Sequence, residues 1–481
     1  MTASELGDGQ AGLPSERSSS SFWLREPSST LLGHRTTAQL PAAVDVAVVG
    51  SGITGAFAAR TLVGAGRDVL MLEAREACWG ATGRNGGHCQ PGVWYSKPAV
   101  ARFELATFDL LAGLVADEGI ACDWHVVGGV HPLYTPAQLD AARAQIQRLQ
   151  RHPDLRTKAL LVEGDEALAE HRVPGALGAI YQPAAAKCWP YKLVAWVLER
   201  LLRGHDAAEG RFNLQTHTPV LHLQRAGGGS WIVHTPRGQV AARHVVLATN
   251  AYTSYLLPRV TGLIVPVQGQ VCALRPPPGA ALLAHSYAWA VGSADDYMIQ
   301  RSAGEDGAGG EQAAGAIILG GERGAVAGGK EGVFRDDLVD PVIGRHLRRA
   351  LCPVIKLRPG AADEEPELEA AYEWTGAMGY SRDTHPWVGR VPAGLLGAES
   401  GGGAIDTDGL WISAGYTGHG MPVAARCGIA VAEMMLGREG DKGAVVLPDE
   451  FRASDERAAA SRTMALPRSL KDRAKMMGEC D

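Results

Sequence analysis

A run of closely spaced glycines carries the strongest chemical signal in the sequence. The run follows a short apolar stretch, precedes small apolar residues at helical spacing, and reads Gly50, Ser51, Gly52, Ile53, Thr54, Gly55. In such a turn the first glycine permits a tight reversal, the second lets the backbone approach a pyrophosphate, and the third lets helix and strand pack closely. The free N–H groups at the start of the helix then face the phosphate charge.

An acidic residue completes this pattern. Glu73 stands about 20 residues beyond the glycines, at the end of the next apolar run, where it can accept hydrogen bonds from a ribose. Its neighbours Ala74 and Arg75 belong to the same predicted site. Glycine turns also occur for packing alone, but here strand, turn, helix and acid stand in the expected order. The motif predicts dinucleotide binding, disfavours NADP because the acid repels a 2′-phosphate, and leaves FAD and NAD open.

A second glycine-rich run follows soon after. It comprises Gly80, Ala81, Thr82, Gly83, Arg84, Asn85, Gly86, Gly87 and His88. Arg84 and Asn85 offer donors at a turn, which suits a pyrophosphate or the edge of a flavin. The alternative is a surface turn with a solvated arginine.

With this run the chain resembles the D-amino-acid-oxidase-like family of FAD-dependent oxidoreductases, which includes glycine, sarcosine and γ-glutamylputrescine oxidases. Members carry Gly-Ala-Ser-Gly-Arg-Asn-Gly-Gly shortly after the glutamate, and Thr82 here replaces the usual serine while keeping the hydroxyl. Two later segments, Val246–Tyr252 and Gly409–Met421, are similar to the family's returning strand and its C-terminal flavin loop. The resemblance implies FAD, a Rossmann-type domain built from discontinuous segments, and an α+β substrate domain with an antiparallel sheet.

The two later segments supply further candidate residues. Ala248, Thr249 and Asn250 end a buried strand and can contact the adenine half, although asparagine is also common in turns after strands. The C-terminal loop precedes a helix, so its N–H groups and the helix dipole face whatever lies before it. The resemblance implies that this group is the pyrimidine edge of the flavin. The loop residues assigned to the site are Gly415, Thr417, Gly418, His419, Gly420 and Met421.

Catalytic and substrate contacts rest on fewer signals. We assign His419 as catalytic, against the alternative of an ordinary loop histidine. Arg301 resembles the arginine that pairs with a substrate carboxylate in several amino-acid oxidases, although an exposed hairpin arginine explains it equally well. Aromatic residues that can line an amine pocket, or belong to the core, are Trp94, Trp189, Tyr191, Trp374 and Trp387.

Two departures from the family limit what the resemblance implies. Sarcosine oxidases attach the flavin through a cysteine shortly before the C-terminal motif, and residues 370–376 contain none, so we expect non-covalent FAD. Those enzymes also place a lysine over the flavin to help oxygen react, whereas the alignment puts Ile317, Ile318 and Leu319 there. Reaction with oxygen is therefore less secure than amine oxidation.

The elements that must position these residues follow from hydrophobic periodicity. Strands over Val44–Val49 and Val69–Leu72 flank a helix over Ala56–Val63, which makes a βαβ unit. We expect helices over 102–116, 138–150, 191–202 and 423–436, strands over 231–234, 245–248 and 410–414, and a hairpin of 297–300 with 317–319 around a loop over 304–315.

The predicted division follows these elements and the family pattern. Residues 41–92, 185–255 and 371–447 form the FAD-binding domain, and residues 93–184 and 256–370 form the substrate domain. Residues 1–40 are rich in Ser, Gly, Pro and Thr and are predicted to be a mobile tail, although Phe22, Trp23 and Leu24 can lie in a groove. Residues 448–481 are predicted to be a loosely held C-terminal tail.

Composition excludes several classes of protein. A net charge of -6 without a basic block gives nucleic acid or anionic lipid no electrostatic footprint. The eight scattered cysteines predict neither a metal site nor a disulfide framework. We see neither a secretory signal nor a membrane span, so a cytoplasmic protein is expected.

These observations predict an FAD enzyme that oxidises a C–N bond of a small amine or amino acid. Hydride passes from the α-carbon to flavin N5 and leaves an imine, with oxygen or another molecule as the final electron acceptor. The alternatives are a dehydrogenase or tailoring oxidoreductase that acts on a larger metabolite with a non-oxygen acceptor, and a flavin- or nucleotide-binding protein without catalysis.

Overall fold

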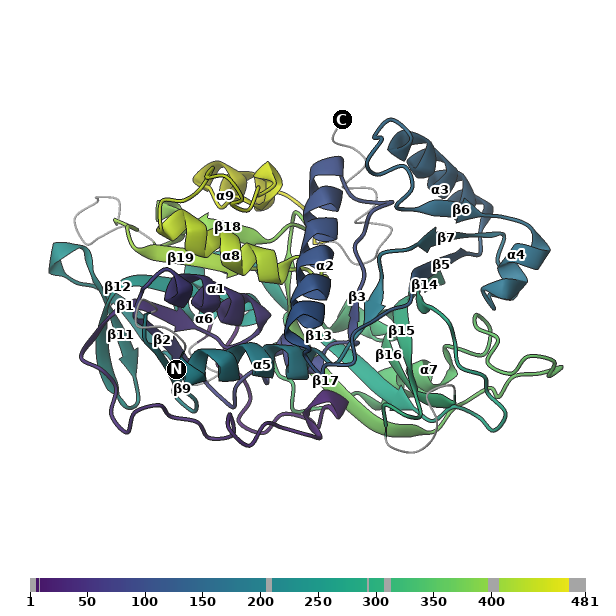
Figure 1. Ribbon diagram of the computed structural model, residues 1–481, viewed down its shortest axis with the longest axis horizontal. Coiled ribbons are helices and arrows are strands. Elements are labelled where there is room, and N and C mark those ends of the chain that lie inside the picture. The colour runs from purple at the N-terminus through teal and green to yellow at the C-terminus, as the bar shows by residue number, and fades with distance from the viewer. Residues whose placement is uncertain are drawn as a thin grey trace.

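Two eight-stranded sheets lie on either side of the long helix α2 (Pro98–Glu118), which stands upright between them in Figure 1. The computed structural model describes residues 6–7, 9–204, 210–291, 294–306, 313–396 and 406–466. Within these residues, no helix combines the length and the apolar character needed to cross a membrane.

The first sheet is mainly parallel and contains the predicted βαβ unit. Its strands are β1 (Ala43–Val49), β2 (Val69–Leu72), β9 (Phe212–Gln215), β10 (His222–Arg225), β11 (Trp231–Thr235), β12 (Gly238–Leu247), β18 (Trp387–Arg390) and β19 (Leu410–Ala414). The central strand β1 pairs in parallel with β2 and β12, and its buried run of valines explains the position. Helices α1 (Ile53–Gly64) and α8 (Ala424–Met435) lie side by side over one face (Figure 1).

The second sheet is antiparallel apart from the parallel pair β5 and β14. Its strands are β5 (Gly129–Leu133), β6 (Leu160–Val162), β7 (Gly178–Gln182), β13 (Ile264–Leu274), β14 (Ser286–Val291), β15 (Ala294–Ser302), β16 (Ala314–Gly321) and β17 (Ala370–Ser381). Side chains alternate between the two faces. Cys272 and Leu319 pack toward α7 (Pro341–Arg349), while Val271 and Ile318 join the core shared with the first sheet.

A small sheet and short helices complete the fold. The sheet contains β3 (His88–Cys89), β4 (His125–Val126) and β8 (Ala186–Lys187). The other helices are α3 (Pro136–Leu149), α4 (Asp165–Glu170), α5 (Pro190–Arg203), α6 (Thr253–Leu256) and α9 (Asp455–Ser461). Strand β3 follows directly from the second glycine-rich run, so it carries that run toward the second sheet.

The predicted elements agree well with these bounds, and the predicted hairpin is β15 paired with β16. Most of its loop, residues 307–312, lies outside the described residues. One predicted boundary needs correction. Strand β17 pairs along its length with β13, so residues 370–381 belong to the second sheet, although the predicted division placed residues 371–447 with the first.

The N-terminal segment also differs from its prediction as a mobile tail. Residues 9–40 run along the first sheet and the second glycine-rich run (purple in Figure 1). Trp23 is fully buried, its Nε1 donates to the carbonyl of Asn85 at 2.6 Å, and the Ser21 hydroxyl donates to the carbonyl of Gly83 at 2.8 Å. A few large apolar side chains therefore anchor a segment whose overall composition predicted disorder.

The start of the predicted C-terminal tail is anchored in the same way. Phe451 is 1% exposed, and Arg457 on α9 pairs with Asp383 at 2.6 Å. Residues 467–481 lie outside the described residues.

Candidate active site

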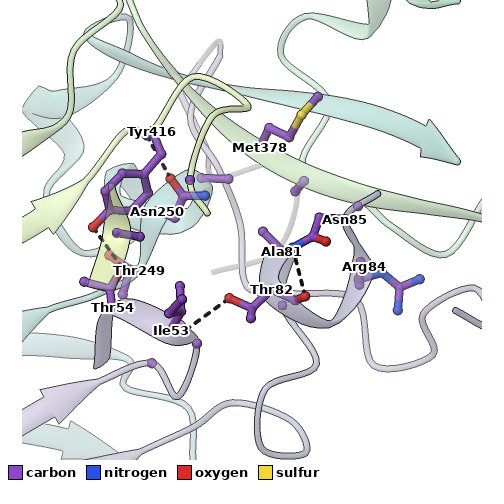
Figure 2. Close-up of a pocket in the computed structure, with 18 of the residues that line it drawn as sticks. Ile53, Thr54, Ala81, Thr82, Arg84, Asn85, Thr249, Asn250, Met378 and Tyr416 are labelled. Carbon is purple, nitrogen blue, oxygen red and sulfur yellow. Dashed lines mark hydrogen bonds between the residues drawn. The ribbon is translucent and has the colours of Figure 1, made fainter. Parts of the chain in front are cut away.

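A cavity of about 240 Å³ lies where the two large sheets meet. Its lining joins both glycine-rich runs, the end of β12, the C-terminal loop and the inner face of the second sheet. Figure 2 shows how these segments, distant in sequence, surround one space. Because the lining draws on nearly every predicted cofactor segment, the cavity is the natural place to test those predictions.

The first glycine run forms a cradle that larger residues would fill. Gly50 has a φ of +104°, and a Cβ there would lie 2.7 Å from the carbonyl oxygen of Ala248. A Cβ on Gly55 would lie 2.0 Å from the carbonyl oxygen of Gly50. On Gly52 it would meet the Thr82 hydroxyl at 3.1 Å. The first N–H groups of α1 thus open onto the cavity through backbone alone, as a bound pyrophosphate requires.

Glu73 stands beside this cradle as predicted. Its Oε2 accepts hydrogen bonds from the backbone N–H and the hydroxyl of Ser51, at 3.1 and 2.6 Å, and its Oε1 accepts from the N–H of Arg75 at 3.0 Å. Ala74 also lines the cavity. The carboxylate is thus fixed at the cavity wall, where it fits hydroxyl donors such as those of a ribose and repels phosphate.

The second run crosses the cradle and caps α1. The Thr82 hydroxyl accepts a hydrogen bond from the N–H of Ile53 at 3.1 Å, which is drawn in Figure 2. Asn85 closes the turn, with its Oδ1 accepting from the N–H of Gly87 at 2.8 Å. Gly87 has a φ of +70°, and a Cβ there would lie 2.2 Å from the Trp23 ring. The hydroxyl that Thr82 shares with the family's usual serine therefore joins the two glycine runs.

Arg84 and Arg75 belong to the cavity lining, and their guanidinium groups are bonded to protein partners. Arg75 forms a bidentate pair with the buried Asp336 at 3.0 and 2.9 Å. Arg84 donates to the carbonyl of Thr375 at 2.6 Å and to the hydroxyl of Ser19 at 2.7 Å, and it points away from the cavity in Figure 2. Burial lowers the pKa of Arg84 to about 10, against the opposing charge of Asp336.

Asn250 connects the end of β12 to the C-terminal loop. Its Oδ1 accepts a hydrogen bond from the N–H of Gly415 at 3.1 Å, and its φ of +42° turns the chain sharply. Ala248 and Thr249 line the cavity beside it. Asparagine tolerates this left-handed conformation, so the residue serves as a connector between two cavity walls as well as a lining residue.

The C-terminal loop reaches the cavity just before α8. Gly418, His419, Gly420 and Met421 line it, whereas Gly415 and Thr417 stand behind them. The N–H of Thr417 donates to the carbonyl of Gly379 at 2.7 Å, which fixes the loop to β17. The loop therefore holds the positive end of a 12-residue helix against the cavity, in the predicted position.

A polar cluster lines the far side of the cavity, under the second sheet. The ring of His88 packs edge-on against Tyr297 at 5.3 Å, and His88 Nδ1 is buried without a hydrogen-bond partner among the described residues. Gln90 contacts His131 at 2.6 Å between Nε2 atoms. Burial lowers the pKa of His88 to about 4 and that of His131 to about 3. The cluster is thus rich in hydrogen-bonding atoms but neutral near pH 7.

His419 faces the same cluster from the C-terminal loop. Its Nε2 lies 3.0 Å from Oε2 of Glu104, a residue of α2 that is 3% exposed. The His419 side chain keeps 26% of its surface exposed. A histidine that contacts both a buried carboxylate and an open cavity is suited to proton transfer.

Arg301 lies elsewhere, which corrects its predicted role. It does not line the cavity; its guanidinium is 1% exposed and pairs with Asp306 at 2.8 Å and with Asp123 at 3.2 Å. The 3.5 Å contact with Glu305 adds a third carboxylate. Because its charge is already compensated inside the protein, the geometry gives no support to pairing with a substrate carboxylate.

The strand predicted to lie over the flavin, β16, contributes no residue of the predicted stretch to the cavity lining. Ile317, Ile318 and Leu319 of β16 are core residues that do not line the cavity. The lining comes from β13 and β17, through Gly269, Val271 and residues 376–378. The aromatic residues considered for an amine pocket are also outside the lining: Trp94, Trp189, Tyr191, Trp374 and Trp387.

Several lining or supporting residues were missed by sequence reasoning. Gln90 and Tyr297 give no local signal, because one follows a glycine run and the other lies in an ordinary strand pattern. Leu13 and Pro14 line the cavity from a segment predicted to be mobile. Glu104 offered a signal, since a charged residue at an apolar position of an amphipathic helix is unusual.

Comparison with known proteins agrees with this geometry. A family model described as FAD dependent oxidoreductase matches residues 45–434. The chain is 28% identical over 410 residues to glycine oxidase of Pseudomonas aeruginosa, which covers 82% of this chain and 95% of that protein. It is 24% identical over 419 residues to a Rhizobium meliloti protein named "Probable oxidoreductase OrdL", which covers 82% and 83%.

A solved structure shares the fold. Glycine oxidase from Geobacillus kaustophilus superposes with a TM-score of 0.64 at 20% identity, covering 83% of this chain and 96% of that one. The predicted fold class, a Rossmann-type α/β domain with a second α+β domain, is thereby confirmed.

Proposed function

The chain belongs to the family of FAD dependent oxidoreductases, and from that premise we propose that it oxidises a C–N bond of a small amine or amino acid to an imine. Membership confirms the predicted resemblance and FAD as the cofactor. The observation that carries the proposal is the continuity of the cavity, which runs from the glycine cradle to the neutral polar cluster under the second sheet.

The cradle residues fit the two ends of this cofactor. The N–H of Gly52 at the start of α1 would hold the pyrophosphate, while that of Ile53 is bonded to the Thr82 hydroxyl, and Glu73 would accept from a ribose. Gly418 and Gly420 would present backbone to the flavin edge that becomes negative on reduction. When bound, FAD supplies the two-electron acceptor that the side chains lack.

The polar cluster would orient the substrate. His88, Gln90 and Tyr297 present hydrogen-bonding atoms and an aromatic face to the cavity, while Val271 and Met378 add apolar surface. Small amines combine a polar nitrogen with an apolar stem, so both kinds of surface are needed. His419 would contact the substrate nitrogen from the loop.

Anaerobic reduction of the bound flavin tests the proposal directly. The purified yellow protein would be mixed with primary and secondary amines and with both enantiomers of amino acids, without oxygen. Bleaching near 450 nm by members of one amine class supports the proposal. A protein that keeps FAD but is bleached by no amine or amino acid would contradict it.

We also propose that the FAD is held non-covalently. Residues 370–376 contain no cysteine, and Cys89, beside the second glycine run, is a buried thiol whose pKa is raised by burial. Acid precipitation should therefore release all flavin into solution. Colour that stays with the pellet would overturn this part of the proposal and direct attention to His88.

One observation favours a second candidate, a dehydrogenase that passes electrons to an acceptor other than oxygen. Among the described residues that line the cavity there is no lysine, whereas the resemblance implies that sarcosine oxidases place one over the flavin to help oxygen react. Measuring peroxide release in air with a substrate that bleaches the flavin separates the two candidates. Stoichiometric peroxide favours the oxidase.

A further inference from the structure

Glu104 breaks the pattern of the helix that carries it. Its neighbours on the buried face of α2 include Phe103, Thr107 and Phe108, and Glu104 itself is 3% exposed. Burying a carboxylate is costly unless it is paired and hydrogen-bonded. Its Oε2 accepts hydrogen bonds from the backbone N–H of Gly92 and from His419. Among the described residues, the side chain bonded to Glu104 is therefore that of His419, which belongs to the cavity lining.

The pairing fixes the two ring nitrogens of His419 in different roles. Nε2 faces Glu104 at 3.0 Å and serves as the donor. His419 belongs to the cavity lining, and its Nδ1 makes no hydrogen bond to any residue that the structure describes. A neutral ring that carries its proton on Nε2 has its lone pair on Nδ1, which leaves that atom available to a substrate.

The surroundings set the charge that this ring can carry. His88 on β3 and His131 on β5 are buried and neutral near pH 7, and the Tyr95 ring lies 6.4 Å away. Cys89 and Cys427, whose thiol pKa values burial raises, face Glu104. Among the residues that the structure describes, Glu104 is the carboxylate in contact with His419, so a positive charge on that ring would have a partner that the rings of His88 and His131 lack.

We propose that Glu104 and His419 form a proton-accepting dyad for substrates that arrive as alkylammonium ions. This inference rests on the proposed function, because oxidation of a C–N bond requires the lone pair of a neutral amine. The Nδ1 lone pair bonds to an ammonium proton, the substrate N–H bond breaks, and its electron pair stays on nitrogen. The positive charge moves from the substrate to the imidazole ring, where Glu104 stabilises it. His419 is then the catalytic group and Glu104 a positioning residue.

The decisive variant is Glu104→Gln, because its amide oxygen can accept both hydrogen bonds while the charge is lost. We would measure the rate constant of anaerobic reduction for wild type and variant and divide it by the substrate dissociation constant. This ratio would then be followed as a function of pH. Without the carboxylate the protonated ring has no ion-pair partner, so the acid limb should move to lower pH. The plateau should fall at least tenfold, since general bases contribute roughly 10²–10⁴-fold.

Controls separate this role from a structural one. Glu118→Gln removes the same charge from the exposed end of α2 and should leave the profile unchanged. If Glu104→Gln fails to retain FAD, Glu104→Asp keeps the charge and should restore binding with the wild-type acid limb. Equal acid limbs and plateaus in wild type and Glu104→Gln, with FAD content intact, would overturn the dyad.

A titration without substrate distinguishes failure of the dyad from failure of the proposed function. Histidine labelled at Cε1 would be followed by NMR in the holoenzyme, with His419→Gln identifying the resonance. Its titration midpoint should fall in Glu104→Gln even if no amine bleaches the flavin. An unchanged midpoint would overturn the dyad, whether or not an amine substrate is found.

Discussion

The two ends of the cavity are built in opposite ways. The glycine end comes mostly from one continuous stretch, β1, its turn, α1 and β2, and its chemistry lies in backbone N–H groups. The polar end combines β3, β15, β17 and the C-terminal loop, and its chemistry lies in the side chains of His88, Gln90, Tyr297 and His419. A site made of backbone N–H groups needs glycines, which leave a local pattern in the sequence. A site made of side chains needs only residues that the fold brings together, and these leave no such pattern.

The largest effect is expected from Gly52→Val at the glycine end. The added Cβ would meet the Thr82 hydroxyl at 3.1 Å, and its branches would fill the space where backbone and pyrophosphate meet. We expect complete loss of FAD from a folded protein, measured as flavin absorbance after gel filtration. Gly64→Val is the matched control, because it lies in the same helix with open space around it. Stoichiometric FAD in Gly52→Val would show that the turn does not hold the cofactor.

The difference between the ends also explains what the sequence could reveal. The structure places the cradle, Glu73 and the loop before α8 around one cavity, and each has a local signal in the spacing of glycines, acids and apolar residues. The partners of Arg84 and Arg301 have no such signal, because a sequence shows a charge but not the carboxylate that compensates it. Asp336 and Asp123 lie far from these arginines in the chain.

Long-range packing accounts for the remaining differences. The N-terminal segment has a disordered composition, yet Trp23 fills the space over Gly87 that only the folded second run provides. Residues 371–381 were predicted within the FAD-binding domain, with no strand of their own, and the pairing of β17 with β13 places them in the second sheet. The contact between Glu104 and His419 also depends on long-range packing, because the two residues lie 315 positions apart in the sequence.

The next largest effect should come from Asp336→Asn, behind the glycine end. Asp336 is fully buried and pairs with Arg75 and Arg84. Removing its charge leaves two buried guanidinium groups without compensation, which should lower the free energy of unfolding by about 3 to 5 kcal/mol. Urea denaturation of the apoprotein measures the change. A second variant, Arg84→Gln, tests the alternative that Arg84 contacts the cofactor. Loss of FAD binding in this variant, with unfolding like that of wild type, would support the predicted contact.

At the polar end, the pH dependence of stability should report the neutral histidines. Burial lowers the pKa of His131 to about 3, so below its unfolded value of about 6.5 the unfolded state binds more protons. Its contribution to the free energy of unfolding is present above about pH 6.5 and is lost as pH falls. His131→Asn should flatten the profile between pH 7 and 5 by about 2 kcal/mol. Equal slopes in both proteins would mean that His131 binds its proton over the same pH range in the folded and unfolded states.

The last prediction concerns Gly418, where backbone from the C-terminal loop meets the polar end. Sulfite adds to oxidised flavin and places negative charge on the edge that the loop and the α8 dipole would face. Gly418 has a φ of +72°, so leucine there should displace the loop. Helix ends contribute about 0.3 to 2 kcal/mol and a dedicated donor roughly 3 to 4, so sulfite affinity should fall more than tenfold.

A matched glycine makes this last test specific. Gly437 follows the other end of α8 with a φ of +68° and open space beyond it. Gly437→Leu introduces the same backbone strain away from the cavity and should leave sulfite affinity unchanged. Both proteins must first contain full FAD. If the two variants bind sulfite equally well, the loop would be a structural turn that ties β17 to α8, and the backbone chemistry of the cavity would be confined to its glycine end.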